Sequence, residues 1–184
     1  MQIIKVASPS DSLLFGKANK YHYVDSFQGS IIDTNNTITP LAVLKAFFQT
    51  SPKWVSALLS LRNRIVKVLG LKTSQNSKNK EELIANLKGV PNEQIGLFKI
   101  FESSPNEIVM GEDDKHLNFR VSLFLDSFSS HHELKNIIIT TTVQFNNIFG
   151  KLYFLPVKPF HHQIVPSILK GIIKELKSNS TQLS

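Results

Sequence analysis

Arg62 is the residue whose position most strongly suggests a chemical role. It lies in a stretch, residues 52–70, in which apolar residues including Trp54 recur at helical spacing. At about 100° per residue, Arg62 falls at the edge of this apolar stripe, away from the other basic residues of the helix. A guanidinium on a burying face needs a carboxylate or several carbonyl oxygens, because an unpaired buried charge is costly. We therefore expect Arg62 to be mostly buried, and either to pair with a carboxylate, to bind an anion in a pocket, or to extend to solvent.

Three consecutive acidic residues, Glu112, Asp113 and Asp114, are the densest group that could supply this carboxylate. They predict a structural ion pair with Arg62. Neighbouring carboxylates also raise one another's pKa, which would suit acid–base chemistry beside His116. The alternative is structural, because Asp in a hairpin turn forms local hydrogen bonds.

His161 is the third candidate. Helical geometry places it near the middle of the apolar arc of the last helix, where a charged imidazolium would be costly, so we expect it to be buried and neutral. If the space between the sheet and the helix is packed, His161 would be a core histidine whose ring nitrogens form hydrogen bonds with nearby protein groups. Beside a cavity it would orient the polar end of a ligand or act as a base. The adjacent histidine pairs at 131–132 and 161–162 lack a partner at metal-ligand spacing, so no metal site is predicted.

Several other kinds of chemistry find no support in the sequence. The chain has no cysteine, which excludes disulfides and thiolate nucleophiles. It lacks a Gly-x-Ser-x-Gly elbow and both common nucleotide-binding glycine motifs, so the sequence predicts no catalytic residue and no cofactor. The basic face of the 52–70 helix has no interleaved exposed aromatics, so nucleic acid is not an expected partner.

Charge is unevenly distributed along the 184 residues, whose formal net charge is +7. No acidic residue lies between Asp33 and Glu81, a stretch that carries many lysines and arginines. Among the charged residues at 81–133, by contrast, acidic residues outnumber basic ones. This asymmetry permits an anion-binding or membrane-surface patch. The alternative is that the acidic and basic segments lie beside each other and neutralise internally.

Periodicity predicts the elements that position these residues. A strand is expected at 21–32, a helix from the Thr39–Pro40 capping signal to about Gln49, a second helix at 52–70 and a short one at 81–88. Strands follow at 97–103, 107–111, 116–125 and 134–145, separated by turn residues. A last helix begins near Pro159, is kinked at Pro166, and carries a wide apolar arc to Leu176.

This order predicts an α+β fold of helix-grip type. A curved antiparallel sheet packs on the long C-terminal helix, with two helices inserted after the first strand. Residues 1–19 form an N-terminal extension, 20–177 a single domain, and 178–184 a polar tail. Trp54, Phe119 and Phe145 would be core residues in any fold. If the sheet and the helix enclose a cavity, the same three residues line it with Arg62 and His161.

Several strings along the chain are similar to a known family. They are residues 47–55 (FFQTSPKWV), 61–63 (LRN), 111–122 (GEDDKHLNFRVS), 145–147 (FNN), and a closing string from Tyr153–Phe154 to Pro159–Phe160–His161. Over about 21–176 the chain resembles the bacterial domain-of-unknown-function family 2867. That resemblance implies a fold similar to the START/polyketide-cyclase helix-grip superfamily, whose members hold apolar ligands between sheet and helix. Family members occur alone or attached to short-chain-dehydrogenase-like proteins, and the family has no established activity.

Three functional hypotheses follow. The first is non-catalytic binding of a small apolar or amphipathic ligand between the sheet and the C-terminal helix. The second is an enzyme, or a dehydrogenase-associated accessory, that uses Arg62, Asp113, His116 and His161 on such a ligand. The third is an interaction module, a homodimer or the partner of a separate dehydrogenase-like protein. With no signal peptide and no apolar run long enough for a membrane span, a cytoplasmic location is expected.

Overall fold

The computed structural model describes residues 2–50, 80–126 and 133–181, with no side-chain description at 18, 19, 80, 180 and 181. The helix expected at 52–70 therefore lies outside the described residues, together with Trp54, Arg62 and the predicted ion pair of Arg62.

The centre of the fold is one antiparallel sheet of seven strands in the order β1-β2-β7-β6-β5-β4-β3. The strands are β1 (Ile3–Val6), β2 (Tyr23–Ile32), β3 (Gln94–Ile95), β4 (Phe98–Ser103), β5 (Glu107–Asp113), β6 (Leu117–Asp126) and β7 (Leu134–Phe145). This confirms the α+β class and the antiparallel sheet. The N-terminal extension contributes β1, which pairs with β2, so the inserted helices follow the second strand of the sheet rather than the first.

Four helical segments accompany the sheet in the described ranges: η1 (Phe15–Lys20), α1 (Pro40–Gln49), α3 (Lys80–Asn86) and α4 (Ile148–Thr181). Helix α1 starts as the capping signal predicts. The side chain of Thr39 accepts a hydrogen bond of 3.2 Å from the amide of Ala42, and Pro40 occupies the first turn.

Helix α4 differs from the sequence expectation, because it begins at Ile148 rather than near Pro159. The side chain of Asn147 accepts a hydrogen bond of 3.1 Å from the amide of Gly150 and caps this earlier start. Pro156, Pro159 and Pro166 all lie within α4. Each proline lacks one backbone donor, but its fixed φ is compatible with a helix.

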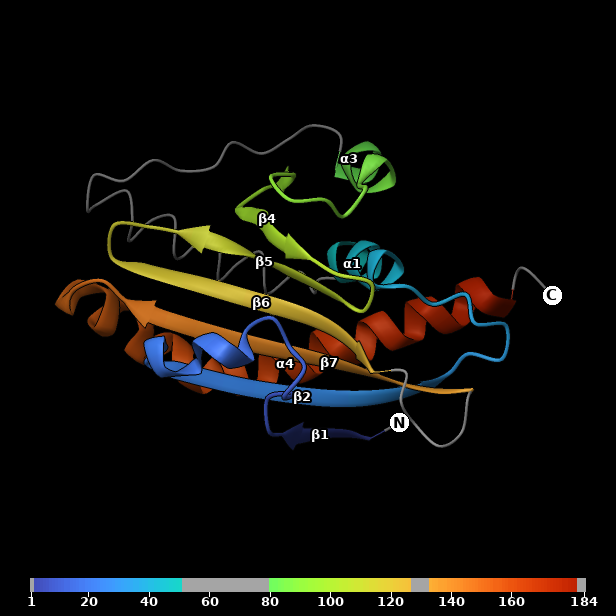
Figure 1. The fold of residues 1–184 in the computed structure, drawn as a ribbon, viewed down its shortest axis with the longest axis horizontal. Coiled ribbons are helices and arrows are strands. Elements are labelled where there is room, and N and C mark those ends of the chain that lie inside the picture. Colours follow the sequence, from blue (N-terminus) through green and yellow to red (C-terminus); the bar gives the residue numbers. More distant parts are fainter. Residues whose placement is uncertain (1, 51–79, 127–132, 182–184) are drawn as a thin grey trace.

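The two faces of the sheet are covered differently, as Figure 1 shows. Helices α1 and α4 cover one face, where the main core includes fully buried Ile137, Ile139, Leu169 and Ile172. The N-terminal segment crosses the opposite face and ends in η1.

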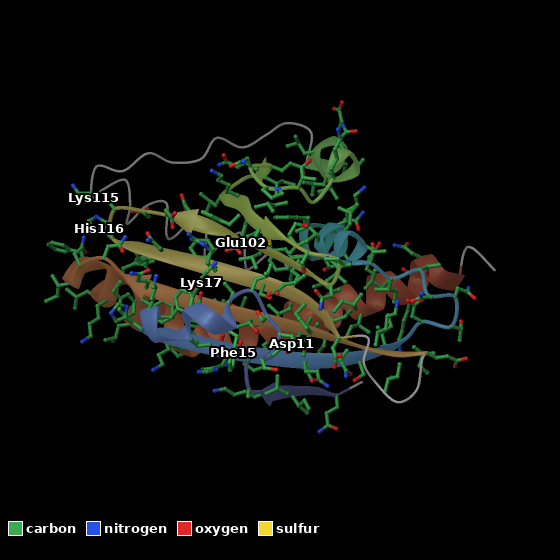
Figure 2. The ribbon with its side chains drawn as sticks, viewed as in Figure 1. Asp11, Phe15, Lys17, Glu102, Lys115 and His116 are labelled. Atoms are coloured by element: carbon green, nitrogen blue, oxygen red, sulfur yellow. The ribbon has the colours of Figure 1, made fainter. Side chains whose placement is uncertain are left out.

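A buried carboxylate fixes this segment to the sheet. Glu107 of β5 is 1% exposed and accepts hydrogen bonds from the Ser12 hydroxyl and the Leu13 amide, each 2.7 Å long, and from Ser122 of β6. Lys17 and Glu102 form a further ion pair at the surface, visible in Figure 2. The N-terminal extension is therefore an integral layer of the fold.

Candidate functional site

A cluster of three polar side chains lies between β2 and α4. Asp25 of β2 is at its centre, and its Oδ2 accepts a hydrogen bond of 2.6 Å from the Tyr23 hydroxyl. The same oxygen lies 3.1 Å from Nδ1 of His161 on α4. His162 is more exposed, with its Nδ1 3.9 Å from that oxygen. Tyr23 and Asp25 share the helix-facing side of β2, because side chains two apart in a strand point the same way.

The carboxylate of Asp25 is buried but incompletely bonded. Its side chain is 1% exposed, and its second oxygen, Oδ1, has no hydrogen-bond partner among the described residues. A buried carboxylate oxygen without a donor is costly, so it marks either strain or a place where a further donor binds. Partial burial, together with the hydrogen bond to Asp25 and its negative charge, raises the pKa of Tyr23 above its ordinary value, so Tyr23 remains a hydrogen-bond donor at neutral pH.

An aromatic cluster connects these residues to the start of α4. The rings of Tyr23 and Phe154 lie 4.9 Å apart, and those of Phe154 and Phe145 lie 5.6 Å apart. His22 stacks on Phe145 at 5.2 Å. Beside this stack an open pocket of about 490 Å³ is lined by His22, Phe145, Asn146, Asn147, Ile148 and Lys151. The pocket therefore presents an aromatic wall, amides and one ammonium group.

The structure brings together some of the residues singled out from the sequence. His161 joins the Asp25 cluster, where its side chain is 14% exposed and hydrogen-bonded rather than fully buried. Phe145 lines the open pocket, and its partial burial agrees with a lining position. Phe119 lies in another aromatic group, 5.7 Å from Phe98, and packs against the main core. Phe119 also packs against the cluster around Phe154, to which Phe145 belongs, so it lies between the main core and that cluster.

The acidic residues at 112–114 have other partners than His161. Asp113 forms an ion pair of 2.8 Å with Arg120, whose guanidinium lies 3.5 Å from the centre of the Phe101 ring. Asp114 accepts a hydrogen bond of 3.2 Å from the amide of His116, as a turn aspartate does. Asp113 and Arg120 lie on the face of the sheet opposite α4, so the structure separates Asp113 from His161.

Tyr23 and Asp25 are the site residues that sequence reasoning missed. The signal was present, because the strand predicted at 21–32 alternates, and Asp25 falls on the same side as Phe27 and Ile31, both buried. A carboxylate at a burying position of a strand requires a partner. Nothing local in the sequence identifies that partner as His161, which is 136 positions away.

The space between the sheet and the second half of α4 is packed. Leu169, Ile172 and Ile173 are fully buried, and Gly29 of β2 provides room for this approach. A Cβ on Gly29 would lie 2.6 Å from the Cδ1 atom of Ile173. The candidate site therefore lies toward the first half of α4, where polar and aromatic groups replace the aliphatic core.

The described residues include no group of three or more side chains able to hold a metal ion. In the same ranges, no helix combines the length and the apolar character needed to cross a membrane.

The fold and the cluster define a class: an α+β protein whose antiparallel sheet is covered on one face by a long C-terminal helix, with a hydrogen-bonded Asp–His pair between them. Residues 17–168 match the family described as "Protein of unknown function (DUF2867)". The chain belongs to that family, as its motifs indicate. Comparison with curated proteins gives no match, and comparison with solved structures gives none either.

Proposed function

We propose that this protein binds a small amphipathic molecule at the first half of α4. The polar end of the ligand meets Asp25 and His161, and its apolar part lies along the aromatic cluster of Tyr23, Phe154 and Phe145. The observation that carries the proposal is the buried Asp25 carboxylate, whose Oδ1 has no partner in the described structure. A ligand hydroxyl or amine could donate to this oxygen and offset the cost of burying it.

The surroundings of Asp25 favour an amphipathic ligand over a wholly polar one. Phe154 is buried, and Tyr23 and Phe145 are half-buried beside it, so the cluster offers an apolar surface next to one charged group. Such a combination is typical of small-molecule sites, in which apolar walls give affinity and a few polar groups orient the ligand. The arrangement is compatible with the helix-grip mode of binding and with a cytoplasmic protein.

Native mass spectrometry of the purified protein tests this proposal. We expect a co-purified small molecule that is retained by wild type and lost from Asp25→Asn and from His161→Phe, with circular dichroism showing that both variants are folded. Asp11→Asn is the matched control, because Asp11 is exposed and lies outside the cluster. Equal retention by wild type and both site variants would refute the ligand role. Loss of folding in His161→Phe, with retention in Asp25→Asn, would identify His161 as a structural residue.

The Asp25–His161 geometry favours one second candidate, acid–base catalysis on the bound molecule. The carboxylate of Asp25 is the hydrogen-bond partner of Nδ1 of His161, so Nε2 is the ring nitrogen that would meet a substrate. A carboxylate placed in this way orients an imidazole as a general base. If the retained molecule is a substrate, NMR spectra of the isolated ligand incubated with the protein should change with time. His161→Gln should abolish that change while it preserves hydrogen bonding. A ligand that stays unchanged with wild-type protein would exclude catalysis.

A further inference from the structure

The first half of α4 has two apolar sides. One side packs on the sheet through Phe154 and, further along, Val165. The other side is exposed to solvent. It consists of five large apolar residues, each more than half exposed, which we call the α4 apolar ridge: Ile148, Phe149, Leu152, Leu155 and Phe160.

The ridge is continuous. At about 100° per residue its members fall within an arc of about 140° that also contains Pro156 and Pro159. They span about four turns, roughly 20 Å along the helix. Exposed apolar side chains are normally scattered over a protein surface, so five of them on adjacent turns mark an interaction surface. Figure 1 shows this half of α4 at the end of the molecule where β7 ends.

The charges around the ridge are positive. Lys151 and Lys158 are exposed along one flank, and the exposed Lys170 and Lys174 continue the angular range of the ridge itself in the second half of the helix. The only acidic residue in the sequence of α4 is Glu175, which is half-buried on the opposite side. The exposed side of the helix is thus apolar for its first half and basic beside and beyond it.

This pattern gives a pairing of two copies through α4 no charge complementarity. Parallel packing of two ridges would bring the lysines of one helix against those of the other. Antiparallel packing along the full length of the helix would place the basic half of each helix against the apolar half of its partner. Neither arrangement gives complementary contacts.

We propose that the α4 apolar ridge docks on an anionic lipid surface. The ridge would enter the boundary between headgroups and acyl chains, and the flanking lysines would extend to the anionic headgroups, as amphipathic helices do in the plane of an interface. The absence of acidic groups on that side fits a negatively charged partner. This proposal rests on the exposed side of α4; of the residues that carry it, Lys158 also lies 5.7 Å from the centre of the Tyr23 ring, and Lys151 lines the open pocket.

Flotation with lipid vesicles tests the proposal. The full chain is mixed with vesicles of phosphatidylcholine containing about one third phosphatidylglycerol, and in parallel with pure phosphatidylcholine vesicles. We expect binding to the anionic vesicles that weakens with added salt, and much weaker binding to the neutral vesicles. The double variant Leu152→Ser/Leu155→Ser should bind at least about tenfold more weakly, because it removes two apolar side chains from the ridge.

Ile32→Ser is the matched control, because Ile32 is 65% exposed but lies on β2, away from the ridge. It should bind like wild type. A second variant, Lys151→Gln/Lys158→Gln, keeps the ridge and should lower binding about fivefold per lysine, with less salt dependence. It also tests the proposal if the serine variant does not fold.

Three results would overturn the proposal: no binding of wild type to anionic vesicles, equal binding by the double serine variant, or an equal loss in Ile32→Ser. A concentration-dependent dimer in analytical ultracentrifugation that Leu152→Ser/Leu155→Ser abolishes would assign the ridge to a second copy instead.

Discussion

Replacement of Asp33 should be among the most destabilising changes outside the hydrophobic core. Asp33 follows β2 directly, and its side chain is 2% exposed. Its carboxylate accepts hydrogen bonds from the amides of Thr37 and Ile38, 3.0 and 2.9 Å long, and forms an ion pair of 2.6 Å with Lys135 of β7. These contacts tie the end of β2 to β7 and to the segment that leads into α1.

The magnitude follows from what Asp33→Ala leaves behind. Among the described residues, the ammonium of Lys135, 6% exposed, would keep only the oxygens of Asn36 and Ile38 as partners, 2.6 and 3.2 Å away. Two backbone amides would also lose their acceptor. Breaking one side of a buried, hydrogen-bonded ion pair costs about 3–5 kcal/mol. We therefore expect a loss of about 4 kcal/mol in the free energy of unfolding, a large share of the roughly 5–15 kcal/mol typical of a domain.

Urea unfolding followed by circular dichroism measures this loss. With a slope of about 2 kcal/mol per molar, the midpoint of Asp33→Ala should fall by about 2 M. Lys135→Met keeps much of the packing but removes the charge. The double variant Asp33→Ala/Lys135→Met should lose less stability than the two single variants together, by about 0.5–3 kcal/mol, because the two groups interact directly. A midpoint shift in Asp33→Ala equivalent to less than about 1 kcal/mol would refute this account of the pair.

The same group predicts a pH dependence with a definite sign. Burial alone would raise the pKa of Asp33, but the hydrogen bonds from Lys135 and from the amides of Ile38 and Thr37, together with the lysine charge, outweigh burial and hold it below its ordinary value. Because the folded-state pKa is the lower one, the carboxylate contributes its full stabilisation above the ordinary pKa of Asp. It loses that stabilisation as the pH falls toward the folded-state pKa. Asp33→Asn should lack this part of the acid destabilisation, and an unchanged acid profile in that variant would contradict the assignment.

Two further perturbations test how other segments are held. Glu107→Ala removes the acceptor of Ser12 and Leu13, so the N-terminal segment should detach; limited trypsin digestion should then cleave near Lys17 much faster than in wild type, and equal rates would show that the segment is held otherwise. Gly150→Ala should destabilise the start of α4 by about 1–3 kcal/mol, because the new Cβ would lie 2.0 Å from the backbone oxygen of His116; thermal unfolding measures the change, and an unaltered midpoint would refute this close approach.

Local patterns predicted most of the secondary structure. The alternation in residues 116–125 and 134–145 corresponds to β6 and β7, and the Thr39–Pro40 signal begins α1. These predictions succeed because a strand or a capped helix depends mainly on its own residues and on which of its sides is buried. The last helix was expected to begin near Pro159, but α4 begins at Ile148, where the side chain of Asn147 caps it.

What the sequence by itself determined is therefore which side chains must be buried. Only the tertiary structure decided which partners they meet there. Helical spacing placed His161 on the burying side of the last helix, and the alternation of the strand at 21–32 held the same information for Asp25, which the sequence analysis missed. Their pairing across 136 positions depends on how α4 lies on the sheet. In the same way, Asp113 pairs with Arg120 because strand register brings β5 and β6 side by side. Periodicity specifies on which side of a helix or strand a side chain lies, whereas a contact between two elements depends on the free energy of packing the whole chain.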